Sequence, residues 1–279
     1  MLRTDGVALV TGAARGLGWG IARAFGNAGA KICVTDISDE ELARCGRDLA
    51  GDGTEYEICR SDVADLAACQ TVVKQIVDRW GRLDVVVHNA IYMPLISFEA
   101  ATPEEWSRQI DVGLGGLFNC TYAVWDQMKA QGGGHIIGIA SGSSVRGYKE
   151  EVAYCTVKHG IEGFIKALSL EAQPHNIALN TVGPGTRIKP TRITWAEHDA
   201  APEESRAGWA DPVELGKAWV WLAAQPPSRF SGYRFDAAKI VETIAREGVD
   251  FEFAVEKVTL YPADFRARQE WYSTYADRT

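Results

Sequence analysis

Three side chains in the middle of the sequence have the types and spacing of a proton-transfer site. Tyr154 and Lys158 are four residues apart in a segment with helical periodicity, so they share one face of the predicted helix. Ser141 follows the apolar run His135–Ala140, at the end of a predicted strand. A free tyrosine has a pKa of about 10, and a nearby ammonium favours the phenolate. The pattern predicts that Tyr154 exchanges a proton with a substrate, that Lys158 lowers the phenol pKa, and that Ser141 holds the substrate oxygen.

A glycine-rich turn near the N-terminus has the composition of a phosphate-binding loop. The segment TGAARGLG begins at the end of the predicted strand Val7–Thr11 and leads into a predicted helix over Leu17–Ala28. Glycines permit a tight turn and close approach to a pyrophosphate, and the helix start offers free N–H groups. The sequence therefore predicts dinucleotide contacts from Gly12, Arg15, Gly16, Leu17 and Gly18.

An acidic residue at the end of the second predicted strand indicates which dinucleotide binds. Asp36 lies 18 positions after Gly18, close to the offset of about 20 residues at which a carboxylate hydrogen-bonds the adenosine ribose. A carboxylate at this place repels a 2′-phosphate, which favours NAD over NADP. Arg15 is an opposing signal, because a cation in the loop can meet a 2′-phosphate. Asp36 carries more weight because we expect it nearer the ribose.

Together these motifs resemble the short-chain dehydrogenase/reductase family. Besides the glycine spacing and the Ser–Tyr–Lys set, the fourth predicted strand ends in His88-Asn89-Ala90, and the resemblance covers residues 6 to about 235. It implies that the lysine also hydrogen-bonds the nicotinamide ribose. It further implies cofactor contacts from Asp62, Val63, Asn89, Ala90, Tyr154, Lys158, Pro184, Gly185 and Thr186.

The sequence departs from the family pattern at several positions. Asp111 stands where the family has a catalytic Asn, whose main-chain carbonyl holds a proton-relaying water in relatives. The carbonyl survives this exchange, whereas the added carboxylate would change how the catalytic lysine titrates. Ile91 replaces the usual glycine of the fourth-strand motif, and Lys189 replaces a threonine unless Thr186 or Thr191 takes that place. The common Asp-Gly-Gly ending is absent.

Cations gather in the segments expected to cover the substrate. In folds of this kind the ligand lies beyond the carboxyl ends of the strands, under the segment Gly185–Arg206. That segment contains Arg187, Lys189 and Arg192, and the loop after Ser141 adds Arg146 and Lys149. They favour an anionic substrate group, with an ordinary solvated lid as the alternative. The predicted substrate contacts are Ser143, Tyr148, Arg187, Arg192 and Trp195.

Alternating strand and helix patterns predict the fold that positions these residues. Short apolar runs indicate strands at Val7–Thr11, Lys31–Asp36, Glu55–Arg60, Leu83–His88, His135–Ala140 and Ile177–Val182. Helical patterns cover Leu17–Ala28, Asp39–Leu49, Leu66–Trp80, Pro103–Lys129, Glu151–Ala172, Pro212–Ala224 and Asp236–Arg246. The order is typical of an α/β fold, a single-domain doubly wound parallel sheet (Rossmann fold) over residues 1–235. We expect residues 236–279, rich in aromatics, to form a C-terminal extension packed on this domain or a neighbouring subunit.

Composition excludes several other classes of protein. The 279 residues carry a formal net charge of −8, opposite to the basic field of a nucleic-acid-binding protein. No apolar run is long enough to span a membrane, and no secretory signal is evident, so we expect a cytoplasmic protein. The six cysteines form no Cys-x-x-Cys pair and the histidines are scattered, which favours reduced thiols and no metal site. The family resemblance implies a homotetramer or homodimer.

The sequence thus predicts an NAD-dependent oxidoreductase that interconverts a secondary alcohol and a ketone by hydride transfer. Tyr154 is the expected general acid/base, with Ser141, Lys158 and Asp111 as the other catalytic residues. Two alternatives stay open: an NADP-preferring carbonyl reductase and a non-catalytic NAD(P)-binding sensor on the same fold. Asp111 and Ile91 keep the sensor alternative open, because fold alone does not fix function.

Overall fold

A computed structural model describes residues 6–251, and seven parallel strands form one sheet at its centre. The strand order is β3-β2-β1-β4-β5-β6-β7. The chain winds outward from β1 to β3 and then returns to β4 beside β1, so the winding direction changes between β1 and β4. The predicted doubly wound sheet is confirmed. The strands are β1 (Val7–Thr11), β2 (Lys31–Asp36), β3 (Tyr56–Arg60), β4 (Val85–His88), β5 (Gly134–Ile139), β6 (Ile177–Gly183) and β7 (Arg234–Asp236).

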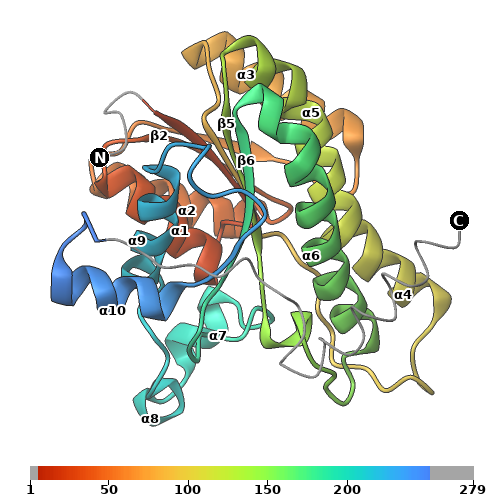
Figure 1. Ribbon diagram of the computed structural model, residues 1–279. Helices are drawn as coiled ribbons and strands as arrows, with labels where there is room; N and C mark the ends of the chain where they lie inside the picture. The colour runs from red at the N-terminus through yellow and green to blue at the C-terminus, as the bar shows by residue number, and fades with distance from the viewer. Residues whose placement is uncertain (1–5, 252–279) are drawn as a thin grey trace, which may run out of the picture.

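Helices cover both faces of the sheet (Figure 1). One face carries α1 (Gly16–Asn27), α2 (Asp39–Gly51), α9 (Pro212–Ala223) and α10 (Ala237–Glu247). The other carries α3 (Leu66–Trp80), α4 (Pro103–Ile110), α5 (Gly116–Ala130) and α6 (Val152–Ala172). The short helices α7 (Trp195–Ala200) and α8 (Glu203–Arg206) lie at one end of the sheet, in the segment between β6 and α9. The central strands are buried on both faces, which explains their continuous apolar runs.

The single helix expected over Pro103–Lys129 is interrupted, and this expectation was wrong in detail. After α4 the chain makes a π-helical turn, η1 (Asp111–Gly115), before continuing as α5. A π turn adds one residue to the helix, and the apolar periodicity on either side does not reveal the addition. Glycines at 113, 115 and 116 weaken the preference for a regular helix there.

The C-terminal extension begins as an integral part of the fold. Asp236 ends β7, and its side chain accepts a hydrogen bond from the Lys239 N–H to cap α10. Ala237 and Ile240 of α10 are fully buried in the same core cluster as α9. Phe251 stacks on Trp221 with ring centroids 4.8 Å apart. The expected packing of the rest of the extension, residues 252–279, lies outside the described residues. No described helix has the length and apolarity needed to cross a membrane.

Two glycines allow α1 and α9 to pack with their backbones almost in contact. A Cβ on Gly20 would lie 2.2 Å from the carbonyl carbon of Pro212, and one on Gly216 would lie 2.6 Å from Cβ of Ala24. Real Cβ atoms do not approach a backbone this closely. The packing fixes the helix that follows the glycine-rich turn relative to the segment that ends at Pro212.

We predict that Gly20→Ala destabilises the protein by about 1–3 kcal/mol, because the new methyl group overlaps the backbone of α9. Urea unfolding followed by circular dichroism measures this change. Gly51→Ala is the matched control, since Gly51 ends α2 and a Cβ there meets nothing within 4 Å. The control should be neutral or stabilising by up to about 1 kcal/mol. Equal stability of the two variants would contradict the close packing.

Candidate active site

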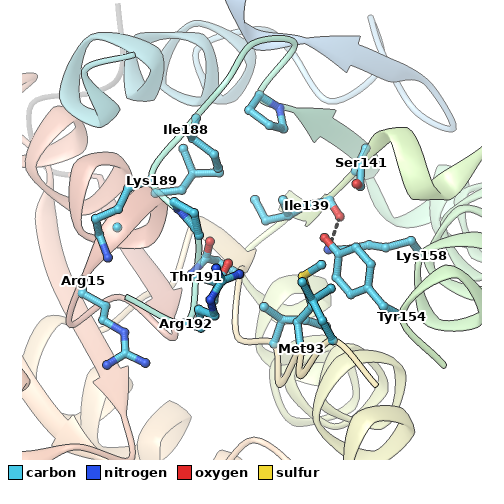
Figure 2. Close-up of a pocket in the computed structure, with 18 residues that line it drawn as sticks. Arg15, Met93, Ile139, Ser141, Tyr154, Lys158, Ile188, Lys189, Thr191 and Arg192 are labelled. Carbon is cyan, nitrogen blue, oxygen red and sulfur yellow. Dashed lines mark hydrogen bonds between the residues drawn. The ribbon is translucent and has the colours of Figure 1, made fainter. Parts of the chain in front are cut away.

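A cavity of about 250 Å³ lies beyond the carboxyl ends of the central strands. The glycine-rich turn after β1, the segments after β4 and β5, helix α6 and the segment after β6 all contribute to its lining. Figure 2 shows Tyr154, Lys158 and Ser141 on one side, and Arg15, Lys189, Thr191 and Arg192 on the opposite side. The structure therefore brings the three predicted catalytic side chains into the cavity that begins at the phosphate loop.

Local backbone structure places the three side chains that the sequence predicts to be catalytic. Tyr154 and Lys158 lie one turn apart on α6, as their spacing predicted. Ser141 follows β5 in extended conformation and caps a short 3₁₀ turn, η2 (Gly142–Ser144), because its hydroxyl oxygen accepts a hydrogen bond from the Ser143 N–H at 3.2 Å. The buried Lys158 ammonium donates to the Ile139 carbonyl at 2.8 Å. Its Nζ atom is 5.5 Å from the centre of the Tyr154 ring.

The ionisation of the tyrosine differs from the sequence-based expectation. Burial raises the pKa of Tyr154 to about 12, and a hydrogen bond with the Ser141 side chain opposes this only in part. Burial lowers the pKa of Lys158 to about 8, against the attraction of Glu162. The expected lowering of the phenol pKa is not found, because loss of solvent outweighs stabilisation of the phenolate in the protein alone. At neutral pH the phenol is therefore protonated.

Arg234, which sequence analysis missed, forms a hydrogen bond with the main chain of Ser141. Arg234 of β7 donates from Nη2 to the Ser141 carbonyl at 2.6 Å. Its Nη1 atom is 3.7 Å from Oε1 of Glu162, a buried carboxylate on α6 whose Oε2 accepts a hydrogen bond from Thr181 at 3.0 Å. Arg234 thus links β7, the turn that carries Ser141, and helix α6. An arginine between two aromatic residues, Tyr233 and Phe235, was the available signal.

The glycine-rich turn fits the pyrophosphate of a dinucleotide. Gly12 has φ +58°, and a Cβ there would lie 2.6 Å from Cα of Ala90. A Cβ on Gly18 would lie 2.4 Å from Nδ2 of Asn89, which donates to the Gly12 carbonyl at 2.7 Å. Helix α1 begins after Arg15 without a side-chain cap, so its first N–H groups are free to meet an anion. These features form a shallow cradle of the kind that phosphate oxygens fill.

The predicted adenosine contacts lie next to this cradle. Oδ2 of Asp36 accepts a hydrogen bond from the Ala14 N–H at 3.3 Å, and Oδ1 accepts one from the Ile37 N–H at 2.8 Å. The carboxylate is therefore fixed between the end of β2 and the glycine-rich turn. Asp62 forms an ion pair with Arg108 at 2.9 Å, and Val63 is buried in the core.

Some predicted residues lie elsewhere. Trp195 covers the outer side of the phosphate loop, where its indole N–H donates to the Ala14 carbonyl at 3.0 Å and its ring packs against Trp19. Arg187 and Thr186 are exposed and do not line the cavity, whereas Leu17, Pro184, Arg192 and Thr191 do. Ser143 is buried and donates to Glu151 at 2.8 Å, and Tyr148 is exposed, with its hydroxyl near Gly142. Gly185 lies against the Asp236 carboxylate, in a neighbouring depression.

The Asp111 carboxylate is not among the groups that shift the pKa of Lys158. Asp111 is exposed at the start of the π turn. Of the two sequence-based possibilities, an altered lysine titration thus receives no support, and the main-chain carbonyl stays as the candidate contribution.

Apolar residues that follow β4 form a part of the cavity that sequence analysis missed. Ile91, Met93 and Leu95 line it on the side of Tyr154, and Ile188 lines it from the segment after β6. Only Ile91 was noted from the sequence, as a departure from a motif. The sequence contained a signal for these residues, because a segment that follows a central parallel strand lies at the ligand-binding edge of the sheet.

All six cysteines are free. No cluster of three or more metal-ligating side chains occurs in residues 6–251.

Comparison with known proteins places the chain in a family. Residues 6–200 match the short chain dehydrogenase family. This chain is a member of that family. The D-threitol dehydrogenase of Mycolicibacterium smegmatis is 32% identical over 235 residues, covering 82% of this chain and 90% of that protein. The galactitol 2-dehydrogenase of Agrobacterium fabrum is 36% identical over 220 residues, covering 76% and 84%. The acetoacetyl-CoA reductase of Paracoccus denitrificans is 31% identical over 230 residues, covering 81% and 93%.

Solved structures of the family have the same fold. A variant of the actinorhodin polyketide ketoreductase with NADPH superposes with a TM-score of 0.75 at 29% identity, covering 85% of this chain and 97% of the other. A metagenomic short-chain oxidoreductase in complex with NADP gives 0.69 at 27% identity, covering 81% and 94%. The chain is therefore a short-chain dehydrogenase with the Rossmann-type fold, in a family of NAD(P)-binding oxidoreductases.

The buried lysine of this short-chain dehydrogenase should reveal itself in the pH dependence of stability. Between pH 8 and 10.5 the unfolded chain binds the Lys158 proton and the folded chain does not, so the free energy of unfolding rises with pH. Without cofactor, we predict that raising the pH from 8 to 10 stabilises the wild type relative to Lys158→Met by about 2 kcal/mol. Urea unfolding at both pH values measures this. Lys74→Met, which removes an exposed lysine of α3, is the control, and equal pH slopes for all three proteins would contradict a depressed lysine pKa.

Proposed function

We propose that the protein is an NAD-dependent oxidoreductase that interconverts a secondary alcohol and a ketone, with Tyr154 as general acid/base. The observation that carries the proposal is the placement of Tyr154, Ser141 and the buried Lys158 in one cavity with the uncapped start of α1. Membership of the family supports the oxidoreductase class. A bound nicotinamide dinucleotide supplies the hydride chemistry.

The residues of this chain would divide the remaining work among them. The Ser141 hydroxyl, next to the Tyr154 phenol, would hold the substrate oxygen by a hydrogen bond. Tyr154 would donate its proton to a ketone oxygen, or accept the proton of an alcohol. Lys158, fixed by the Ile139 carbonyl, would hold a positive charge near the phenol and contact the nicotinamide ribose. Apolar residues on the side of Tyr154 exclude water from the substrate carbon.

The protonation state in the protein alone favours one direction. With a pKa raised to about 12, Tyr154 is protonated at neutral pH and can donate a proton to a ketone oxygen at once. Alcohol oxidation needs the phenolate, which additional positive charge beside the ring must stabilise. The resting site is therefore prepared for reduction, and oxidation should require higher pH.

The fixed carboxylate of Asp36 supports NAD as the cofactor. It lies at the end of β2, hydrogen-bonded to the glycine-rich turn, where a 2′-phosphate would meet negative charge. An NADP-preferring carbonyl reductase is the second candidate. Arg15, which lines the cavity, and the NADP and NADPH complexes of the structural neighbours favour it. A non-catalytic sensor has less support, because Ser141, Tyr154 and Lys158 all line the cavity.

The cavity supports a small substrate with an apolar part and an anionic group. Ile91, Met93 and Leu95 provide the apolar side, and Arg192 provides a cation across the cavity. The relatives act on acetoacetyl-CoA and on polyols, so they span charged and neutral substrates. Exposed aromatics on α5, where Phe118 stacks with Tyr122, support association into a homodimer or homotetramer. The free cysteines are consistent with the cytoplasm as the place of action.

We predict that Tyr154→Phe lowers kcat by about 10²–10⁴-fold, because it removes the proton that the reacting oxygen exchanges. The assay follows NADH formation and consumption with a panel of neutral and anionic secondary alcohols and ketones. NADH binding, followed by its fluorescence, should stay within about threefold of the wild type and serves as the control. Wild-type turnover in Tyr154→Phe would refute the assigned role. Absence of wild-type turnover with every substrate, despite NAD⁺ binding, would favour the sensor.

Asp36→Ala should shift cofactor use toward NADP⁺. We expect the ratio of kcat/KM for NADP⁺ to that for NAD⁺ to rise about tenfold or more, because the substitution removes a like charge from the 2′-phosphate position. Asp39→Ala is the matched control, since it removes an exposed carboxylate from the first turn of α2. An unchanged ratio in Asp36→Ala would favour the NADP-preferring alternative.

A further inference from the structure

His88, the last residue of β4, connects two parts of the site that are far apart in the sequence. Its ring is 1% exposed. The Nδ1 atom lies 3.3 Å from Oγ1 of Thr11, at the end of β1, and the Nε2 atom lies 2.9 Å from the carbonyl of Gly113, inside the π turn. The histidine therefore bridges the strand that leads into the phosphate loop and the turn that begins at Asp111.

Counting donors and acceptors fixes the state of the ring. The Thr11 hydroxyl oxygen already accepts hydrogen bonds from the N–H groups of Asn89 and Ala90, at 3.1 and 3.2 Å. Its own hydrogen must therefore go to Nδ1 of His88, which makes Nδ1 an acceptor. The ring hydrogen is then on Nε2, which donates to the Gly113 carbonyl. Burial and the charge of Lys158 lower the pKa of His88 to about 4, so the ring is neutral under working conditions.

The π turn is held between this histidine and the catalytic helix. A Cβ on Gly113 would lie 2.4 Å from Cγ1 of Val157, the neighbour of Lys158 on α6. A Cβ on Gly116 would lie 2.8 Å from Cε1 of His88. The turn thus contacts β4 on one side and the helix of Tyr154 and Lys158 on the other. A π turn disturbs the regular hydrogen-bond ladder of a helix, and a carbonyl within it benefits from a partner outside the helix.

We propose that His88 is a positioning residue, whose Nε2–H···O=C bond to Gly113 holds the π turn against the helix that carries Tyr154 and Lys158. The proposal rests on the oxidoreductase function proposed above. His88 is buried and does not line the cavity that holds Tyr154 and Lys158. It acts through the turn, and the Thr11 hydroxyl acts by fixing which ring nitrogen carries the hydrogen.

Two substitutions separate the two hydrogen bonds of the ring. The amide of His88→Gln reaches the place of Nε2 and keeps a donor for the Gly113 carbonyl. The amide of His88→Asn reaches only the place of Nδ1, so it keeps an acceptor for Thr11 and leaves the Gly113 carbonyl without its partner. We expect kcat to fall about tenfold or more in His88→Asn and to stay within about threefold of the wild type in His88→Gln. KM for the cofactor should change less than about threefold in both variants.

Hydrogen–deuterium exchange gives a readout that does not depend on turnover. Amides of residues 111–117 should exchange about tenfold faster in His88→Asn than in the wild type and His88→Gln, without cofactor. His135→Asn and His135→Gln are matched controls, because His135 is another buried histidine near the opposite end of the adjacent strand β5. They should affect overall stability without selective exchange at the π turn.

The outcomes separate this proposal from the proposed function. Unchanged kcat and unchanged exchange in His88→Asn would overturn the positioning role, as would equal effects of the Asn and Gln variants. If the wild type turns over no alcohol or ketone, the oxidoreductase function fails. Selective exchange at the π turn in His88→Asn would still support the structural role of His88, and its absence would overturn it.

Discussion

The site depends on the close approach of two backbone segments, the turn after β1 and the segment after β4, just beyond the ends of these paired strands. The chain winds in opposite directions from these neighbouring strands, so their connections diverge and leave a crevice at the carboxyl edge. Asn89 closes the bottom of this crevice by donating to the carbonyls of Thr11 and Gly12. Gly12 lies so close to Ala90 that no side chain fits. The cradle for an anion is therefore a direct consequence of strand order and of two small residues.

Burial of Tyr154 and Lys158 gives the site its electrostatic character. The same loss of solvent that raises the pKa of Tyr154 lowers that of Lys158, since both shifts disfavour the charged form. The cost of burying the ammonium is offset in part by the Ile139 carbonyl and by Glu162. A protein that keeps its tyrosine neutral and its lysine only weakly basic responds strongly to any charge that enters the cavity.

The segment between β6 and α9 lines the cavity and also contacts the glycine-rich turn. Trp195 anchors it to the phosphate loop through the Ala14 carbonyl, while its main-chain N–H donates to Glu41 of α2 at 3.1 Å. Lys189 of the same segment faces Gly16, and burial together with the charge of Arg15 lowers its pKa to about 8. Arg15 and Lys189 are both cations at the start of α1, so they repel one another. An anion bound between them would reduce this repulsion. Trp195 therefore holds the segment between β6 and α9 in place, and it does not line the cavity.

The sequence by itself determined six of the seven strands, the glycine-rich turn, and the spacing that brings Tyr154 and Lys158 to one helix face. These features depend on local rules, such as alternating patterns, glycines at a strand–helix turn, and a spacing of four residues on one helix face. Tertiary structure alone decided the π turn, the positions of Arg187 and Trp195 outside the cavity, and the support of Ser141 by Arg234. It also decided the ionisation of Tyr154, because a pKa shift depends on how much solvent the folded chain removes from the ring. Residue types and spacing specify which groups are available, whereas burial and contacts between distant segments determine what each group does.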